Sequence, residues 1–204
     1  MAIRVLGISG SPHRHGNTET LLDSFLEGAH GAGASVEKVV IADLKYTSCR
    51  GCNACHKTGT CVLKDDFIAL FEKIAAADCL AIASPIYSMG ITAELKALID
   101  RAQYLWAQKF IVKTLSYSPG HMKRHKGVFL STAGLPRKDV FDYAFPTIRA
   151  FFNGVGFEYY DNILYNSMDA SGGIQKHPTA LVTARERGAA VVKDLETLFA
   201  ASPE

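Results

Sequence analysis

The feature that most constrains the fold is the loop at residues 7–18, GISGSPHRHGNT, which joins an apolar run to a helical pattern. The run before it, residues 3–8, is β-branched and nearly all apolar, which predicts a strand buried on both faces of a parallel sheet. After the loop, apolar residues recur at the spacing of an amphipathic helix: Leu21, Leu22, Phe25, Leu26 and Ala29. This order of strand, loop and helix is the repeating unit of an α/β fold.

The same order recurs along the chain. Further strands are predicted at 36–41, 79–83, 127–130 and 157–165, and helices start near 66, 92, 140 and 178. Five strands alternating with five helices predict a doubly wound five-stranded parallel sheet with helices on both faces. We expect a single domain over residues 1–204, in which residues 106–126 break the rhythm and form an insert or an oligomer contact.

Charge and hydropathy exclude several classes of protein. The formal net charge is +2, and Lys and Arg are scattered, so no basic stripe for nucleic acid is expected. A hydrophobic content of 48% suits a globular domain with a real core. No signal peptide or 18-residue apolar span stands out, so we expect a soluble cytoplasmic protein with no membrane partner.

The loop itself has the chemistry of an anion site. It lies where a strand meets a helix N-terminus, which offers unpaired N–H groups and a partial positive charge. Ser9, Ser11, Asn17 and Thr18 add side-chain donors. The loop lacks both Gly-x-Gly-x-x-Gly and Gly-Lys-Ser/Thr, so it suits a terminal monophosphate; the alternative is a Ser/Gly-rich turn with an ordinary helix cap. The loops at 84–90 and 131–134 should meet it at one sheet edge and could embrace a flat ring.

Four of the five cysteines lie in one Cys-rich loop at residues 49–61: Cys49, Cys52, Cys55 and Cys61. Their spacing, Cys-x2-Cys-x2-Cys-x5-Cys, brings four thiolates around a small volume, and a [4Fe–4S] cluster is the leading interpretation. A tetrahedral zinc site and an unoccupied or oxidised loop are the alternatives, and in the last of these Asp65 and Asp66 merely cap the next helix. Cys79 reads as a small buried hydrophobe.

Taken together, these motifs resemble the flavodoxin-like NAD(P)H-dependent FMN reductases and, within them, the iron–sulfur flavoproteins. The resemblance rests on GISGSPHRHGNTETLL, the cysteine segment, SPIYSMGITAELKALIDR, the STAG loop and the stretch from Asp169 to Pro178. It implies that Ser9, Ser11, Asn17 and Thr18 hold the FMN phosphate. It also implies ring contacts from two further loops, namely Pro85, Ile86, Tyr87, Ser88 and Gly90 on one side and Thr132 and Gly134 on the other. His13 stands where related loops carry Arg.

Function then depends on the cysteine loop. With a cluster bound, the resemblance implies an FMN-dependent oxidoreductase that receives electrons from a ferredoxin-like donor. Without one, the flavin could take hydride from NAD(P)H and reduce a quinone, free flavin or another small-molecule acceptor. Amide N–H groups of the 86–90 turn would favour the reduced flavin. Outside the enzymes, an electron carrier or a thiol- or metal-responsive module remains open. No catalytic side chain is assignable, and the resemblance and the aromatic segment 104–117 predict a homodimer or homotetramer.

Overall fold

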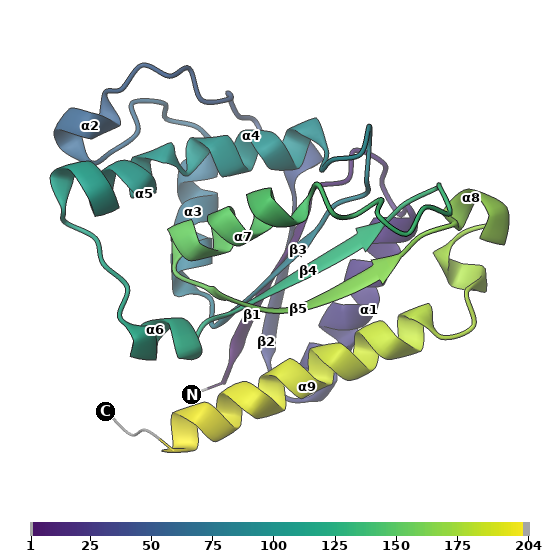
Figure 1. Ribbon diagram of the computed structural model, residues 1–204. Coiled ribbons are helices and arrows are strands. Elements are labelled where there is room, and N and C mark those ends of the chain that lie inside the picture. The colour runs from purple at the N-terminus through teal and green to yellow at the C-terminus, as the bar shows by residue number, and fades with distance from the viewer. Residues whose placement is uncertain (1, 202–204) are drawn as a thin grey trace.

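A five-stranded, all-parallel sheet forms the centre of the protein, as the sequence predicts. The computed structural model describes residues 2–201 (Figure 1). Its strands are β1 (Arg4–Ser9), β2 (Ser35–Val40), β3 (Cys79–Ala83), β4 (Lys126–Thr132) and β5 (Glu158–Tyr165), in the spatial order β2-β1-β3-β4-β5. This is the doubly wound order in which the chain reverses direction across the sheet between β1 and β3, and ligands bind beyond the carboxyl ends of strands at such a point.

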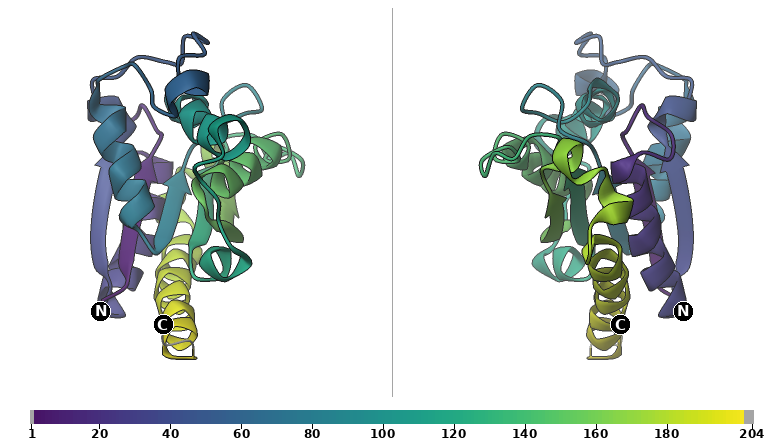
Figure 2. Two further views of the ribbon diagram at one scale, coloured as in Figure 1. Left: turned by 90° about the vertical axis from the view of Figure 1, so that its left-hand side faces the viewer. Right: turned by 90° about the vertical axis from the view of Figure 1, so that its right-hand side faces the viewer.

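Helices cover both faces of the sheet. One face carries α1 (Asn17–Gly31) and α9 (Ala180–Ala201), and the other carries α3 (Asp66–Ala76), α4 (Ala93–Arg101), α5 (Gln103–Ala107) and α7 (Phe145–Val155). Short elements join them: η1 (Ile41–Asp43), α2 (Cys55–Thr58), η2 (Gln108–Val112), α6 (Pro119–Lys123), α8 (Met168–Ser171) and η3 (Ile174–Lys176). Figure 2 shows α2 at the opposite end of the molecule from the two chain ends.

The predicted apolar periodicity of α1 marks its buried face. Leu21, Leu22, Phe25, Leu26 and Ala29 are each no more than 5% exposed. Against this face lies α9, and two glycines allow a close backbone approach: a Cβ added to Gly28 would overlap the carbonyl of Arg185, and one added to Gly188 would overlap the carbonyl of Phe25. The two helices therefore pack backbone to backbone along part of their length.

Element boundaries differ from the prediction where local sequence is ambiguous. The helix expected from about residue 140 begins at Phe145, because Pro146 fits only the first turn of a helix. Residues 106–126 hold the end of α5, the π-helix η2 and the short helix α6. Among the described residues, 2–201, no helix combines the length and apolarity that crossing a membrane requires.

Candidate functional site

A cavity of about 230 Å³ lies beyond the carboxyl ends of β1, β3 and β4, where the sequence places its ligand. Eight of the residues predicted to hold FMN line it: Ser11, Asn17, Thr18, Pro85, Ile86, Tyr87, Thr132 and Gly134. Three loops that are far apart in sequence therefore meet at this one site, as the predicted fold requires.

The hydroxyls in and under this cavity are suited to an anion. Thr18 Oγ1 and Thr132 Oγ1 are buried and lie 2.5 Å apart. Ser9 does not line the cavity, but it ends β1, and its buried Oγ has no hydrogen-bond partner among the described residues. The N-cap of α1 is Gly16, with no side-chain cap, so the alternative of an ordinary Asn or Thr cap is wrong. The end of β1 and the start of α1 thus offer hydroxyls and amides to a phosphate.

The turn after β3 is a tight reversal. Tyr87 and Gly90 exchange two backbone hydrogen bonds of 2.9 Å, and Ser88 and Met89 at the tip have positive φ angles of 48° and 67°. The N–H of Ile86 donates to Thr132 O at 2.9 Å. The amides of Ile86, Tyr87 and Gly90 are thereby engaged within the protein, so these three do not supply the N–H groups that the 86–90 turn was expected to offer a reduced flavin. Ser88 and Gly90 line a neighbouring open cavity with Met89, Arg137 and Tyr143.

Sequence reasoning missed part of the wall. His13, Gly16, Ala133, Met168 and Asp169 also line the main cavity. The carboxylate of Asp169 lies against Gly134, where a Cβ would overlap it, so α8 contacts the loop after β4 at this point. Asn17 has a bond to the same region, because its Oδ1 accepts from Ile174 N at 2.9 Å. His13, Gly16 and Ala133 lie in the two loops that the sequence already marks, and for Asp169 the signal was the resemblance of the stretch from Asp169 to Pro178.

A buried carboxylate, that of Glu19, holds the loop at residues 7–18 in place. Glu19 is 0% exposed, and it accepts hydrogen bonds from His15 N at 2.7 Å and from Lys38 Nζ at 3.0 Å, with Arg14 at 3.4 Å. Burial raises the pKa of Glu19, but the hydrogen bonds from His15 and Lys38 and the charges of Lys38 and Arg14 outweigh it and hold the pKa below its ordinary value of 4.5. Glu19 thus stabilises His15 at its positive φ of 56°.

We expect Glu19→Gln to lower the free energy of unfolding at neutral pH by about 1–2 kcal/mol, since a charged acceptor is lost from three donors. The folded-state pKa of Glu19 is depressed, so this contribution is full above about pH 4.5 and is lost as the pH falls through the folded value. Urea unfolding of both proteins from pH 7 downward measures it. Glu27→Gln, at an exposed ion pair with Arg185, is the control and should change little. Equal destabilisation by both variants at pH 7 would contradict the role of Glu19.

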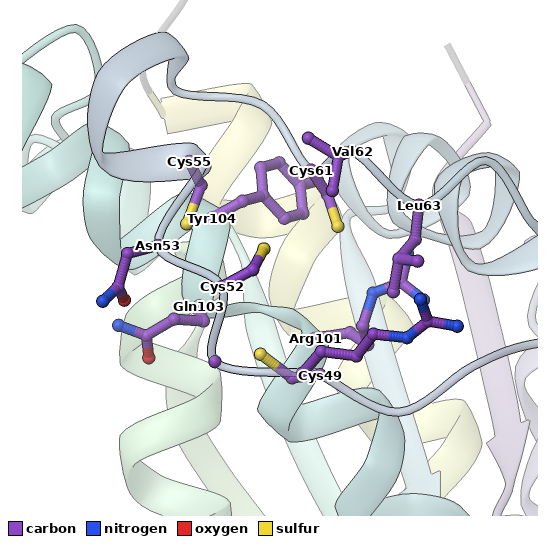
Figure 3. A pocket seen from close by; sticks show the side chains of 12 residues that line it. Cys49, Cys52, Asn53, Cys55, Cys61, Val62, Leu63, Arg101, Gln103 and Tyr104 are labelled. Carbon is purple, nitrogen blue, oxygen red and sulfur yellow. The ribbon is translucent and has the colours of Figure 1, made fainter.

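The four clustered cysteines line a second cavity, of about 140 Å³. Figure 3 shows their sulfur atoms on its walls, with Tyr104 and Arg101 beside them. All four thiols are free. Burial raises the pKa of Cys55 above its ordinary value of 9.0, and the charges of Cys49, Cys52 and Cys61 raise it further. Within residues 2–201 no three His, Cys, Asp or Glu side chains are arranged to hold a metal ion. The donor chemistry fits an iron–sulfur or zinc centre, while the thiols line the cavity without converging on one point.

The base of this cavity holds a buried ion pair that the sequence analysis did not find. Asp65 is the N-cap residue of α3, but its side chain makes no capping bond, which corrects the expectation of a capping role. It instead pairs with Arg101, whose side chain is 1% exposed. Burial lowers the pKa of Arg101, but the hydrogen bond to Asp65 and the charge of Cys61 outweigh it and raise the pKa. Burial raises the pKa of Asp65, but the hydrogen bonds from Arg101 and Thr47 outweigh it and lower the pKa.

Helix α4 connects the two cavities. At its start, Thr92 Oγ1 donates to Gly10 O in the first loop at 2.5 Å and accepts from Leu95 N at 3.3 Å. Its last residue is Arg101 at the cysteine cavity. Nine residues at a rise of 1.5 Å each give the helix a length of roughly 13 Å. One short helix is therefore tied at its start to the loop that borders the first cavity and contributes its last residue to the second.

Comparison with known proteins agrees with this arrangement. Two iron-sulfur flavoproteins match parts of the chain: one from Archaeoglobus fulgidus at 38% identity over 99 residues, 48% of this chain and 45% of the relative, and one from Methanosarcina thermophila at 36% over 111 residues, 54% and 58%. The chain thus spans about half the length of the curated relatives it matches. In fold it is similar to a flavone reductase structure, at a TM-score of 0.70 and 20% identity over 99% of this chain and 66% of that one.

A family model also matches the chain. Residues 3–137 match the family described as "NADPH-dependent FMN reductase". That range includes the first loop, all four clustered cysteines, the turn after β3 and the loop after β4. It leaves out β5, α8 and α9, which complete the sheet and the wall of the first cavity. The chain therefore belongs to the NADPH-dependent FMN reductase family.

Proposed function

We propose that the protein is an FMN-dependent oxidoreductase of the iron–sulfur flavoprotein type, moving electrons between a [4Fe–4S] cluster and FMN. The observation that carries this proposal is the presence of two cavities, one lined by hydroxyls and loop backbone beyond the strand ends and the other by four thiols. Family membership and the names of the two relatives support the same assignment.

In this proposal the first cavity holds FMN. The flavin supplies hydride and single-electron chemistry when it is bound. The chain's own groups bind and orient it: Ser9, Ser11, Asn17 and Thr18 surround the phosphate, and Thr132 and Gly134 border the ring opposite the 85–90 turn. The buried, unpartnered hydroxyl of Ser9 supports this assignment, because a buried polar atom without a partner is costly unless a ligand satisfies it.

We expect Thr18→Val to weaken FMN binding about tenfold to a hundredfold, since a hydrogen bond to the charged phosphate contributes roughly 1.5–3 kcal/mol. Thr132→Val removes the hydroxyl that is hydrogen-bonded to Thr18 at the edge of the ring, and it should weaken binding by less. The two hydroxyls are buried against each other, so valine replaces each with little change of volume. Fluorescence titration of the flavin-free protein measures the dissociation constant. Thr147→Val on α7, outside the residues that line either cavity, should bind FMN as the parent does. An unchanged affinity in both site variants would remove the phosphate from this loop.

The second cavity in this proposal holds the cluster through Cys49, Cys52, Cys55 and Cys61. A cluster supplies one-electron transfer when it is bound. The thiolates ligate the metal, and a cationic centre offsets the mutual repulsion that raises the pKa of Cys55. The alternative is a cluster-free NAD(P)H-dependent FMN or quinone reductase, which the NADPH of the family description supports. Either form passes electrons to a small-molecule acceptor.

A ferredoxin-like donor fits the charge around the cysteines. Residues 44–64 and 102–115 contain six of the 22 Lys and Arg residues and none of the 20 Asp and Glu residues. The fold brings these segments together, with Gln108 Nε2 donating to Gly59 O at 2.8 Å. Arg50, Lys57 and Lys64 are exposed and have no ion-pair partner within the part of the chain that the structure describes. Acidic electron carriers would be attracted to this rim.

We expect reduction of the protein by a small acidic ferredoxin to slow as salt is added, and Lys57→Glu with Lys64→Glu to slow it about tenfold at low salt. Stopped-flow absorbance measures the rate. Lys193→Glu, on α9 at the far face of the sheet, matches the charge change of each single rim variant, and it should leave the rate close to that of the parent where Lys57→Glu and Lys64→Glu each slow it. If the distant variant slows reduction as much as the rim variants, the rim is not the docking site.

A second copy of the chain is the proposed partner of the aromatic segment. Trp106, Phe110 and Ile111 are 42%, 53% and 46% exposed, which is a large apolar surface for one short segment. We propose that this segment forms the contact of a homodimer or homotetramer, as expected from the sequence. Light scattering of the FMN-loaded protein measures the assembly, and a monomer that retains FMN would contradict the contact.

The deciding experiment uses protein purified without oxygen. An absorption spectrum with iron and sulfide assays should give flavin bands with about four irons per chain. Flavin without iron would support the cluster-free reductase, and zinc alone would remove the cluster. Steady-state NAD(P)H oxidation with an added acceptor separates an enzyme from an electron carrier, and a protein that retains no FMN would point to a thiol- or metal-responsive module.

A further inference from the structure

We propose that Arg101 is a positioning residue for the metal centre: from the end of α4 it holds both ends of the cysteine loop together and sets the ease with which the bound centre is reduced. The inference rests on the proposed function, because it concerns a centre held by the four thiolates.

The position of Arg101 is unusual. It heads the set of large, fully buried side chains in the protein, and it lines the cysteine cavity. Arginine is almost never fully buried unless it is paired. Lys96 and Asp100, its polar neighbours on α4, instead form an exposed i, i+4 ion pair with each side chain 48% exposed. Arg101 is thus buried, whereas the other two charged side chains of this part of α4 are exposed to solvent.

The contacts of Arg101 explain what it does to the loop. Nη1 and Nη2 donate to the two carboxylate oxygens of Asp65 at 2.6 and 3.0 Å, and Nη1 also donates to Thr47 O at 2.6 Å. Asp65 in turn accepts from Thr47 N at 2.9 Å. Thr47 precedes the first clustered cysteine by two residues, and Asp65 follows the last by four. One guanidinium therefore closes the cysteine loop at its base.

Arginine is the side chain that this closure needs. The planar fork can satisfy a carboxylate and a carbonyl at fixed angles, whereas a lysine ammonium is a point charge that cannot bind a carboxylate in the same bidentate way. Fixing the two ends removes chain entropy from the loop before any metal binds. The clamp thus lowers the cost of bringing four thiolates together.

The three hydrogen bonds leave two N–H groups of Arg101 over, one on Nη2 and the one on Nε. Nε is buried and has no hydrogen-bond partner among the described residues, although both Nη atoms are used. Hydrogen bonds and net charge near cluster sulfurs are the means by which a protein sets a cluster's reduction potential. Asp65 balances the charge of Arg101, so removing either partner leaves the other uncompensated and should move the potential in opposite directions.

The test compares Arg101→Met, Arg101→Lys and Asp65→Asn with Lys96→Met, which removes a positive charge from the exposed ion pair of the same helix. Spectroelectrochemistry of the anaerobic holoprotein should show Arg101→Met harder to reduce and Asp65→Asn easier, each by about tenfold in the reduced-to-oxidised ratio at fixed potential, or ~59 mV for one electron. Arg101→Lys should keep most of the potential. Lys96→Met should stay within twofold.

A second measurement tests, without metal, whether Arg101 holds the two ends of the cysteine loop together. In the iron-free, reduced protein, hydrogen exchange over residues 48–64 should be about tenfold faster in Arg101→Met and in Arg101→Lys than in Lys96→Met, because both lose the fork. If the parent protein holds no iron, the proposed function fails, but the hydrogen-exchange measurement still tests whether Arg101 closes the cysteine loop. Shifts of the same sign in Arg101→Met and Asp65→Asn, or exchange equal to that of Lys96→Met, would overturn the inference.

Discussion

Replacing Cys55 by alanine is expected to remove nearly all bound iron while the FMN content stays at the level of the parent protein. Cys55 is the third of the four cysteines in the Cys-x2-Cys-x2-Cys-x5-Cys segment, and the three other thiolates all act on its pKa. A four-thiolate centre that loses one ligand loses the geometry on which its affinity depends. The cysteine cavity and the FMN cavity share no lining residue, so the flavin has no contact to lose.

Iron and sulfide assays beside the flavin absorbance of the same anaerobic preparation measure both outcomes. Cys79→Ala is the matched control, since Cys79 is fully buried in β3 and belongs to the hydrophobic core, not to the cysteine cavity. It should retain iron and flavin alike. Iron retained in Cys55→Ala would exclude this residue as a ligand, and loss of both cofactors would show that the two sites depend on each other for folding.

Replacing Gly188 by alanine is expected to lower the free energy of unfolding by about 3 kcal/mol. The added Cβ would overlap the carbonyl oxygen of Phe25 and crowd Ala29 N, which are backbone atoms of α1. Backbone cannot turn aside as a flexible side chain can, so α9 has to move away from α1 and lose packing along the shared face. The loss exceeds the roughly 1 kcal/mol that alanine gains over glycine inside a helix.

Urea unfolding with a common m-value measures the change. Gly154→Ala is the control: Gly154 lies in α7, and a Cβ added there has nothing within 4 Å. It should raise the free energy of unfolding by about 0.5–1 kcal/mol. A neutral Gly188→Ala would mean that α1 and α9 adjust without cost, and the close approach would then be incidental to stability.

The strands could be predicted because each is a short apolar run of the kind that only a doubly covered sheet can bury. β3 has the predicted bounds, β1 is shifted by one residue at each end, and β5 starts one residue later than predicted. β4 is longer than predicted, because Lys126 at its start and Ser131 and Thr132 at its end read as polar loop positions. In the fold Lys126 pairs with Glu158, and Ser131 donates to Ser84 O at 2.6 Å. Polar residues with partners are compatible with a buried strand.

Some residues of the candidate sites could be predicted from the sequence and others could not. Site residues that lie close together in the sequence could be predicted, because a short loop brings its own side chains together. Ser11, Asn17 and Thr18 line one cavity, and all four clustered cysteines line the other. Arg101 and Asp65 are 36 residues apart, and Asp169 follows a different strand from the loop it touches. Contacts of that range depend on how the helices pack on the sheet, and no local spacing encodes them.

In the proposed holoprotein, α4 is the element that would couple the flavin site to the cysteine site, weakly enough that Cys55→Ala still retains its FMN. Thr92 ties the helix to Gly10 in the flavin loop, and Arg101 ties it to Thr47 and Asp65 at the base of the cysteine loop. A ligand that tightens one end restricts the same rigid element at the other. Linkage is reciprocal, so whatever factor bound flavin contributes to the affinity for metal, bound metal contributes to the affinity for flavin. The order in which the cofactors are inserted then changes the route of assembly but not its total free energy.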